Sequence, residues 1–176
     1  MRMGTSSHLS PLMQKAKRLG VRNPSDLEEI AIARGLRYFG RPAELSPDAK
    51  KAMMQAHDHE FFSQEELTIA LMSPTLPYSL NRLRMAGAML GAEGISAEKI
   101  LKLARMERCE TTVRHIAELG SKVEPSQTLW HSLLEQLPPA LNTPPDVLPH
   151  LSRFVTMSGL DRTGRSYRTQ WIRPTP

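Results

Sequence analysis

Apolar residues recur at helical spacing along most of the chain, in short segments that end at glycine or proline. The first segment begins at Ser10-Pro11, where serine can cap a helix and proline suits its first position. It ends at Gly20, a residue suited to the left-handed position that closes many helices. Glutamate follows a capping serine by three residues at two further helix starts, the spacing of a capping box. These two pairs are Ser25 with Glu28 and Ser63 with Glu66.

The stretch from Ser79 to Gly120 contains no proline and has the densest apolar periodicity. One helix is predicted from Ser79 to Gly91, and Ser96 is predicted to cap the next. Within that second helix the apolar positions change phase. At 100° per residue one set points almost opposite to the other. Either one straight helix lies sandwiched between partners, or the chain bends near 106–110 and forms two helices at about 97–106 and 110–119. The first set is Ile100, Leu103 and Ala104, and the second is Cys109, Val113, Ile116 and Ala117.

The segment LARMERCETTVRHI resembles, in its rhythm, the helix-turn-helix of bacterial regulators. In this resemblance Ala104 is the small residue of the first helix, Cys109 is the buried turn residue, and Val113 and Ile116 form the core side of a recognition helix. The spacing from turn to helix is one residue short, and Arg108 stands where a glycine is common. The resemblance implies nucleic-acid contact around the turn. The contact residues would be Arg105, Arg108, Thr111, Thr112, Arg114 and His115.

Ser126 is predicted to cap a strongly apolar helix that has Trp130 as its core anchor. Residues 138–150 contain five prolines and are expected to form an extended linker. Residues 153–157 and 166–172 are rich in β-forming residues and predict a β-hairpin. Arginines and aromatic residues alternate there, so the hairpin could contact nucleic acid or a partner, or its aromatic residues could simply hold it on the helical body. The candidate contacts are Arg162, Arg165, Tyr167, Arg168, Trp171 and Arg173.

The composition favours helix, because only 5% of the 176 residues are aromatic and ten are Met. We therefore expect a mainly α protein: a compact multi-helix bundle with a helix-turn-helix at about 97–119 and a C-terminal β-hairpin. The expected organisation is a disordered N-terminus at 1–9, a helical domain at 10–137, a proline-rich linker at 138–150 and a basic hairpin tail at 151–176.

Charge is unevenly distributed along the chain. Residues 1–41 carry a net charge of +5, residues 42–152 carry −4, and residues 153–176 carry +4. Basic ends on a slightly acidic body are typical of contact with nucleic acid or an acidic partner, although solvated ends can also be basic for solubility.

Motifs for catalysis or cofactors are weak. The pair His57 and His59 could bind a metal on a strand, but on a helix the two imidazoles point apart. Cys109 has no evident base beside it in sequence and is best interpreted as a small buried residue. No phosphate-loop, dinucleotide-binding or hydrolase motif occurs. We therefore expect no catalytic residues, no metal and no cofactor.

These observations favour a non-enzymatic binding protein of bacterial type that contacts nucleic acid, as a regulator or an antitoxin-like accessory factor does. The alternative is a helical protein–protein adaptor whose linker and hairpin dock on a partner, and a small enzyme without a recognisable motif ranks last. A protein partner or a homo-oligomer is compatible with either binding function. The sequence has no apolar run of membrane-spanning length and no secretory signal, so we expect a cytoplasmic protein without a small-molecule substrate.

Overall fold

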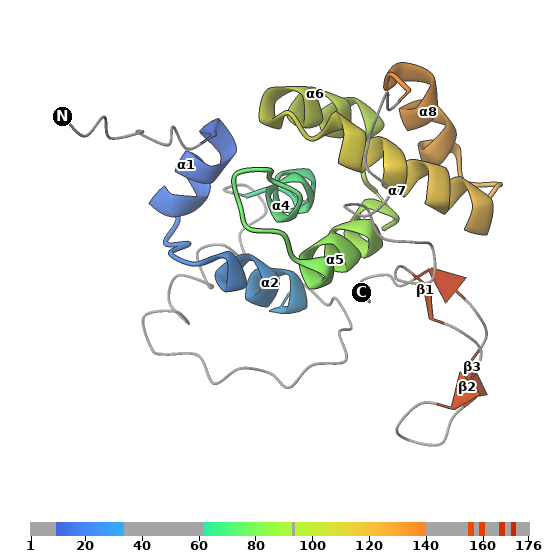
Figure 1. Ribbon diagram of the computed structural model, residues 1–176, viewed down its shortest axis with the longest axis horizontal. Helices are drawn as coiled ribbons and strands as arrows, with labels where there is room; N and C mark the ends of the chain where they lie inside the picture. Colours follow the sequence, from blue (N-terminus) through green and yellow to red (C-terminus); the bar gives the residue numbers. More distant parts are fainter. Residues whose placement is uncertain are drawn as a thin grey trace.

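Helix α4 (Gln64–Leu71) lies at the centre of the molecule, surrounded by α1 (Pro11–Arg18), α2 (Pro24–Ala33), α5 (Leu80–Leu90) and α6 (Ala97–Glu107) (Figure 1). The computed structural model describes residues 10–33, 62–92 and 94–139, together with the backbone of four short strands. Six of the eight residues of α4 are buried, because neighbours cover it on several sides. The described region is mainly α, as predicted.

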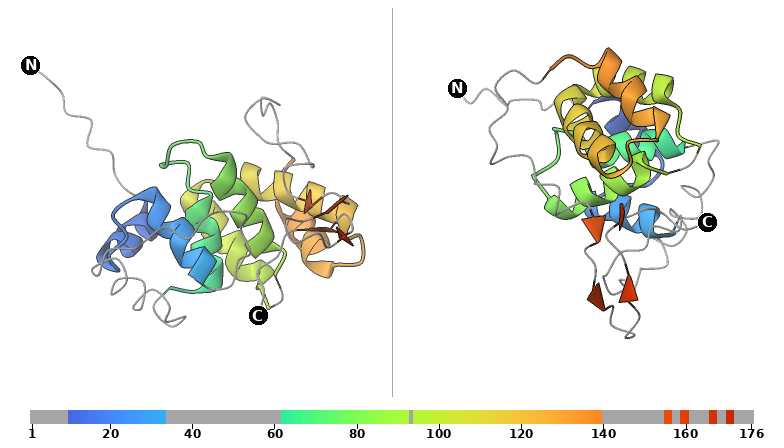
Figure 2. Two further views of the ribbon diagram at one scale, coloured as in Figure 1. Left: turned by 90° about the horizontal axis from the view of Figure 1, so that it is seen from below. Right: turned by 90° about the vertical axis from the view of Figure 1, so that its right-hand side faces the viewer.

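Helices α7 (Glu110–Val123) and α8 (Thr128–Gln136) pack against each other, and both contact α6. They lie at the end of the helical body opposite α1 and α2 (Figure 2). Trp130 anchors this end, since its side chain is completely buried, as the sequence predicts. The described hydrophobic core runs continuously from Leu12 in α1 to Leu137 after α8.

Several helix starts form as the sequence predicts. Ser10, Ser79 and Ser96 each cap a helix by accepting a hydrogen bond from a backbone N–H three residues later. At α4, Ser63 and Glu66 make both bonds of a capping box.

Two predicted caps are wrong. Helix α2 already begins at Pro24, so Ser25 lies inside its first turn. The Asp26 carboxylate accepts the N–H groups of Arg22 and Asn23 at 2.7 and 2.9 Å, the role that the predicted capping box gives to Glu28. Helix α8 begins at Thr128, so Ser126 lies outside it. The cap residue of α8, Gln127, makes no side-chain hydrogen bond to the helix, so this start has no capping signal that spacing could reveal.

Buried carboxylates tie the helices together. Glu65 of α4 accepts the Ser96 N–H at 3.1 Å and so fixes the start of α6. Glu107, at the end of α6, accepts the Leu12 N–H at 2.9 Å and so fixes the start of α1. Each carboxylate satisfies a helix N-terminal donor that α-helical bonding leaves open.

Beyond residue 139 the described backbone consists of four two-residue strands: β1 (Val155–Thr156), β2 (Gly159–Leu160), β3 (Ser166–Tyr167) and β4 (Gln170–Trp171). β1 pairs antiparallel with β4, and β2 pairs antiparallel with β3. The residues between them and all their side chains lie outside the described set, so the β-hairpin and its basic contact surface stay predictions. The same holds for residues 1–9 and for most of the 138–150 linker.

No helix in the described ranges combines the length and the apolar character that crossing a membrane requires.

Candidate nucleic-acid interface

The predicted bend in the 97–119 segment is a complete helix break. Helix α6 ends at Glu107, Arg108 follows with left-handed backbone angles (φ 57°, ψ 40°), and α7 begins at Glu110. The Cys109 N–H returns to the Ala104 carbonyl at 3.0 Å, which closes the end of α6. The expected boundaries, 106 and 110, therefore agree with the structure to within one residue.

The core side of this α6–α7 unit matches the expected residues. Ala104, Val113 and Ile116 are fully buried, and Cys109 is 2% exposed at the turn. The apolar phase reversal thus has the predicted cause: two separate helices bury different faces in one core. This agreement concerns the helix geometry, and whether the unit contacts nucleic acid stays a proposal.

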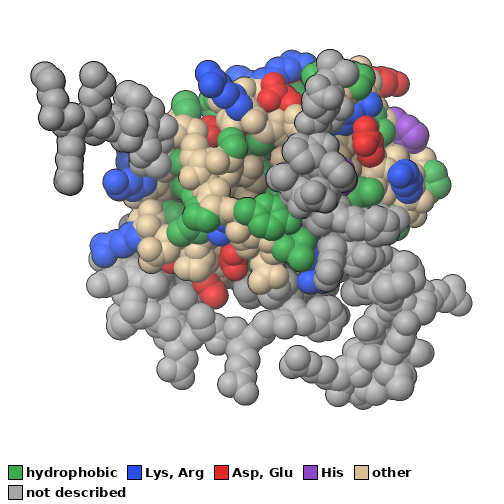
Figure 3. Space-filling model, viewed as in Figure 1, with side chains coloured by type: hydrophobic (Ala, Val, Ile, Leu, Met, Phe, Trp, Pro, Cys, Tyr) green, Lys and Arg blue, Asp and Glu red, His purple; other side chains and the backbone are tan. Residues whose placement is uncertain are grey.

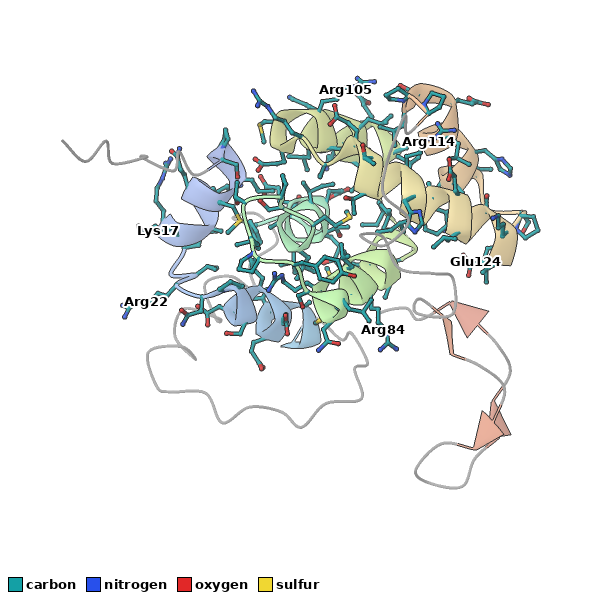
Figure 4. All side chains as sticks on the ribbon, viewed as in Figure 1. Lys17, Arg22, Arg84, Arg105, Arg114 and Glu124 are labelled. Carbon is teal, nitrogen blue, oxygen red and sulfur yellow. The ribbon has the colours of Figure 1, made fainter. Side chains whose placement is uncertain are left out.

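The exposed side of α6 is basic. Lys99, Lys102 and Arg105 are all exposed and recur at intervals of three residues, and the exposed Arg108 follows at the turn. We call these four residues the α6 basic row. Figure 3 shows Lys and Arg side chains along the upper edge of the molecule, where α6 lies, and Figure 4 shows Arg105 pointing outward there. Within the described residues, the side chains of the row make no ion pair.

The exposed side of α7 is less basic. Thr111 and Lys122 are exposed, Thr112 and His115 are half-buried, and Glu118 is 46% exposed. A helix that reads base edges presents polar side chains at its N-terminal end, and Thr111 and Thr112 occupy that place. The charge suited to phosphate lies on α6 and at Arg108.

Arg114 holds two helices together. Its Nε donates to Glu118 Oε1 at 2.9 Å, and its Nη1 donates to the carbonyls of Leu134 (3.1 Å) and Leu137. These carbonyls belong to the last turn of α8 and the residue after it, where α-helical bonding leaves acceptors open. Figure 4 shows the Arg114 side chain between α7 and α8. Its guanidinium therefore has a structural role, whatever it contacts in addition.

A pocket of about 260 Å³ adjoins the turn between α6 and α7. One wall is the α4–α5 connection, residues 71–74 and 76–79, and another is the start of α5. Arg108, Cys109, Thr111 and Thr112, from the α6–α7 turn and the start of α7, also line the pocket. The structure thus brings three of the predicted contact residues, Arg108, Thr111 and Thr112, to one hollow.

Two residues of this pocket do not stand out in the sequence. Tyr78 is 61% exposed, an unusual degree for an aromatic residue beside a hollow. Arg82 falls off the apolar face of α5, yet it is only 7% exposed. Its Nη2 donates to the Pro77 carbonyl, and its Nη1 lies 3.8 Å from Glu28 of α2. Arg82 therefore fixes the proline-rich connection that carries Tyr78. Its two prolines, Pro74 and Pro77, are the one signal of this connection in the sequence.

Cys109 is poorly suited to nucleophilic chemistry. Burial, and next the nearby carboxylates of Glu107 and Glu110, raise the pKa of its thiol to about 12. A nucleophilic cysteine has a lowered pKa, because the thiolate is the reactive form. The thiol therefore stays protonated at neutral pH, which supports a packing role.

The other candidates lie elsewhere. His57 and His59 are outside the described residues, as are the side chains of Arg162, Arg165, Tyr167, Arg168, Trp171 and Arg173. In the described part of the chain, no three His, Cys, Asp or Glu side chains cluster as metal ligands do.

No known protein family, no curated protein and no solved structure matches this chain. The functional interpretation therefore depends on the chain's own geometry and charge.

Proposed function

We propose that this is a non-enzymatic, bacterial-type nucleic-acid-contacting protein, a regulator or an antitoxin-like accessory factor. The α6–α7 unit would act as its helix-turn-helix, and the basic ends with the predicted C-terminal hairpin would add phosphate contacts. The α6 basic row carries the proposal, since four exposed cations lie on one helix and its turn within a segment of net negative charge. Exposed Lys and Arg in this arrangement favour a polyanion.

The geometry favours phosphate contact over base reading. Arg and Lys of the α6 basic row can reach phosphate oxygens, whereas the exposed side of α7 includes the partly exposed Glu118. Phosphate contacts fix position and supply affinity but carry little sequence information. We therefore expect binding with weak sequence preference and strong salt dependence.

The test is the affinity of the full-length chain for a labelled DNA or RNA duplex, measured by anisotropy over a range of salt concentrations. Each phosphate contact contributes about 0.9 to the slope of log affinity against log salt for B-DNA. The double variant Lys102→Gln/Arg105→Gln should lower that slope by about 1.8 on DNA, since two contacts are lost. Lys122→Gln, an exposed lysine near the far end of α7, is the matched control and should leave the slope unchanged. Equal slopes for the wild type and the double variant would refute the assignment.

A protein–protein adaptor is the second candidate, and the exposure of Tyr78 and Met106 favours it. They are the large hydrophobic residues exposed among those described, at 61% and 44%. Exposed aromatic residues often anchor partners. An adaptor should retain a discrete protein from native lysate after nuclease treatment, and truncation after Pro149 should release it. If nuclease alone removes everything bound, nucleic acid is the partner and the adaptor function fails.

A further inference from the structure

We propose that the pocket between the α4–α5 connection and the α6–α7 turn binds a small anion with an apolar ring, either an aromatic carboxylate or an aromatic phosphate ester. This ligand site shares Arg108 with the α6 basic row, but its occupancy can be measured on the protein alone, without nucleic acid. Three properties of the pocket support it: size, charge and the nature of its walls.

The size of the pocket selects a small molecule. Its volume is about 260 Å³. An apolar cavity of ~150 Å³ accommodates one benzene ring, so this pocket has room for a ring with one acidic substituent. It lies just below the ~300 Å³ at which drug-sized sites begin, which favours a ligand of about this size.

The charge of the pocket selects an anion. Its lining includes Arg82 and Arg108 and no acidic residue, although residues 42–152 carry net negative charge. Arg82 is engaged by the Pro77 carbonyl and by Glu28. Arg108 is exposed, and its guanidinium has no hydrogen-bond or ion-pair partner among the described residues. Arg108 is therefore the cation available to a ligand, and its planar fork suits a carboxylate or a phosphate.

Polar donors border the same hollow as Arg108. Thr111 and Thr112 lie in the first turn of α7 and contribute to its lining. The cap residue of α7, Cys109, makes no side-chain hydrogen bond to the helix start. The hydroxyl groups and the partial positive charge of this helix end therefore add to the attraction of Arg108 for an anion.

The remaining wall suits an apolar ring. Leu71, Met72, Leu76 and Leu83 face the hollow, and Tyr78 at its edge leaves most of its side chain exposed. An aromatic ligand would cover part of the Tyr78 ring and gain the offset or edge-to-face contact that aromatic pairs prefer. Arg82 holds the connection that carries Tyr78, so this wall is fixed before a ligand arrives.

The probes are phenylacetate and phenyl phosphate, with phenylacetamide as the neutral control of nearly equal shape, titrated into the full-length protein by calorimetry. We expect at least one anion to bind at least tenfold more tightly than phenylacetamide. The stronger of the two anions identifies the head group as carboxylate or phosphate. No nucleic acid is present, so failure of the nucleic-acid function would not affect the result.

Two variants localise the binding. Arg108→Gln keeps a non-glycine residue at the left-handed position and should weaken the anion tenfold or more, down to the affinity of phenylacetamide. Tyr78→Ala should weaken all three probes, and Lys122→Gln, distant in sequence and outside the lining, should change none. Thermal unfolding confirms that each variant is folded. The proposal is overturned if neither anion exceeds phenylacetamide, or if a folded Arg108→Gln variant binds the anions as the wild type does.

Discussion

A methyl group on residue 120 would overlap the indole ring of Trp130. A Cβ built at Gly120 lies 2.5 Å from Trp130 Cε2 and 2.6 Å from its Cδ2, and the ring is completely buried. The indole also donates from Nε1 to Glu124 Oε2 at 3.3 Å, which restricts how far it can move. Glycine at 120 thus permits the close approach of α7 and α8.

Gly120→Ala should therefore destabilise the protein. Overpacking costs about 1–3 kcal/mol, and the better helix propensity of alanine returns about 1 kcal/mol. We expect a net loss of up to about 2 kcal/mol in urea unfolding. In the double variant with Trp130→Phe the added cost of the methyl group should shrink, because the smaller ring leaves room. A full, additive cost in the double variant would show that the clash lies elsewhere.

The Cys109 thiol should make the free energy of unfolding fall at alkaline pH. The unfolded thiol ionises near its ordinary pKa of 9.0, whereas in the folded protein burial and two carboxylates raise the pKa to about 12. Its contribution is complete below pH 9 and is lost as the pH rises from 9 towards 12, because only the unfolded chain can release the proton. The wild type should therefore lose unfolding free energy relative to Cys109→Ala over this range. Parallel pH profiles for the two proteins would contradict the raised pKa.

At the scale of the elements, the backbone of the α6–α7 turn is strained at one residue. Arg108 adopts the left-handed conformation that glycine accepts freely, at a cost of about 1 kcal/mol for other residues. Arg108→Gly should therefore raise the unfolding free energy by up to about 1 kcal/mol while it removes the cation from both proposed sites. Arg108→Ala, which keeps the strain, is the control and should not stabilise. A Gly variant that is no more stable than the Ala variant would show that the turn is not strained.

Arg114 joins α7 to the end of α8, so its loss should act on stability. Arg114→Ala removes charged hydrogen bonds to two backbone carbonyls and should cost about 1.5–3 kcal/mol in thermal or urea unfolding. Glu118→Ala removes only the half-exposed ion pair and should cost about 0.3–0.5 kcal/mol. If the two variants are equally destabilised, the carbonyl contacts contribute little. Binding measurements with Arg114→Ala must therefore be corrected for the fraction of the variant that is unfolded.

Predictability from sequence differs between local and distant interactions. The serine caps and the break between α6 and α7 depend on residues three to five positions apart, so spacing reveals them. The burial of Arg82 depends on Pro77 and on Glu28 of another helix, and no periodicity records such a contact. The pocket combines two connections about thirty residues apart, which explains why Tyr78 could not be linked to Arg108 in advance.

At the scale of the whole molecule, the central helix is not the most conspicuous one in the sequence. Helix α4 has buried residues on every side and therefore lacks the one-sided apolar pattern by which amphipathic helices are recognised. Helices α6 and α7 have that pattern because each keeps one side in solvent, whereas residues 85–90 of α5 are all buried. Periodicity thus locates the outer layer better than the centre.

The described core ends at Leu137, so a chain truncated after Pro139 should retain the helical fold. We expect cooperative unfolding with a midpoint within a few degrees of the full-length protein, measured by circular dichroism. Its affinity for nucleic acid should fall and its salt slope should decrease, because the truncation removes the five arginines of residues 153–176. Loss of cooperativity would show that the C-terminal segment completes the core.

The hydrogen bond from the Leu12 N–H to Glu107 can form only late in synthesis of the chain. The two residues are 95 positions apart, and α1 has only eight residues, fewer than an isolated helix needs to persist in water. At ~5–20 residues per second, a ribosome takes roughly 5 to 19 seconds to add the intervening chain. During that interval α1 lacks the carboxylate that closes its first turn. We therefore expect α1 to complete its native contacts later than the described helices whose contacts are local, and to be accessible to chaperones and proteases during that interval.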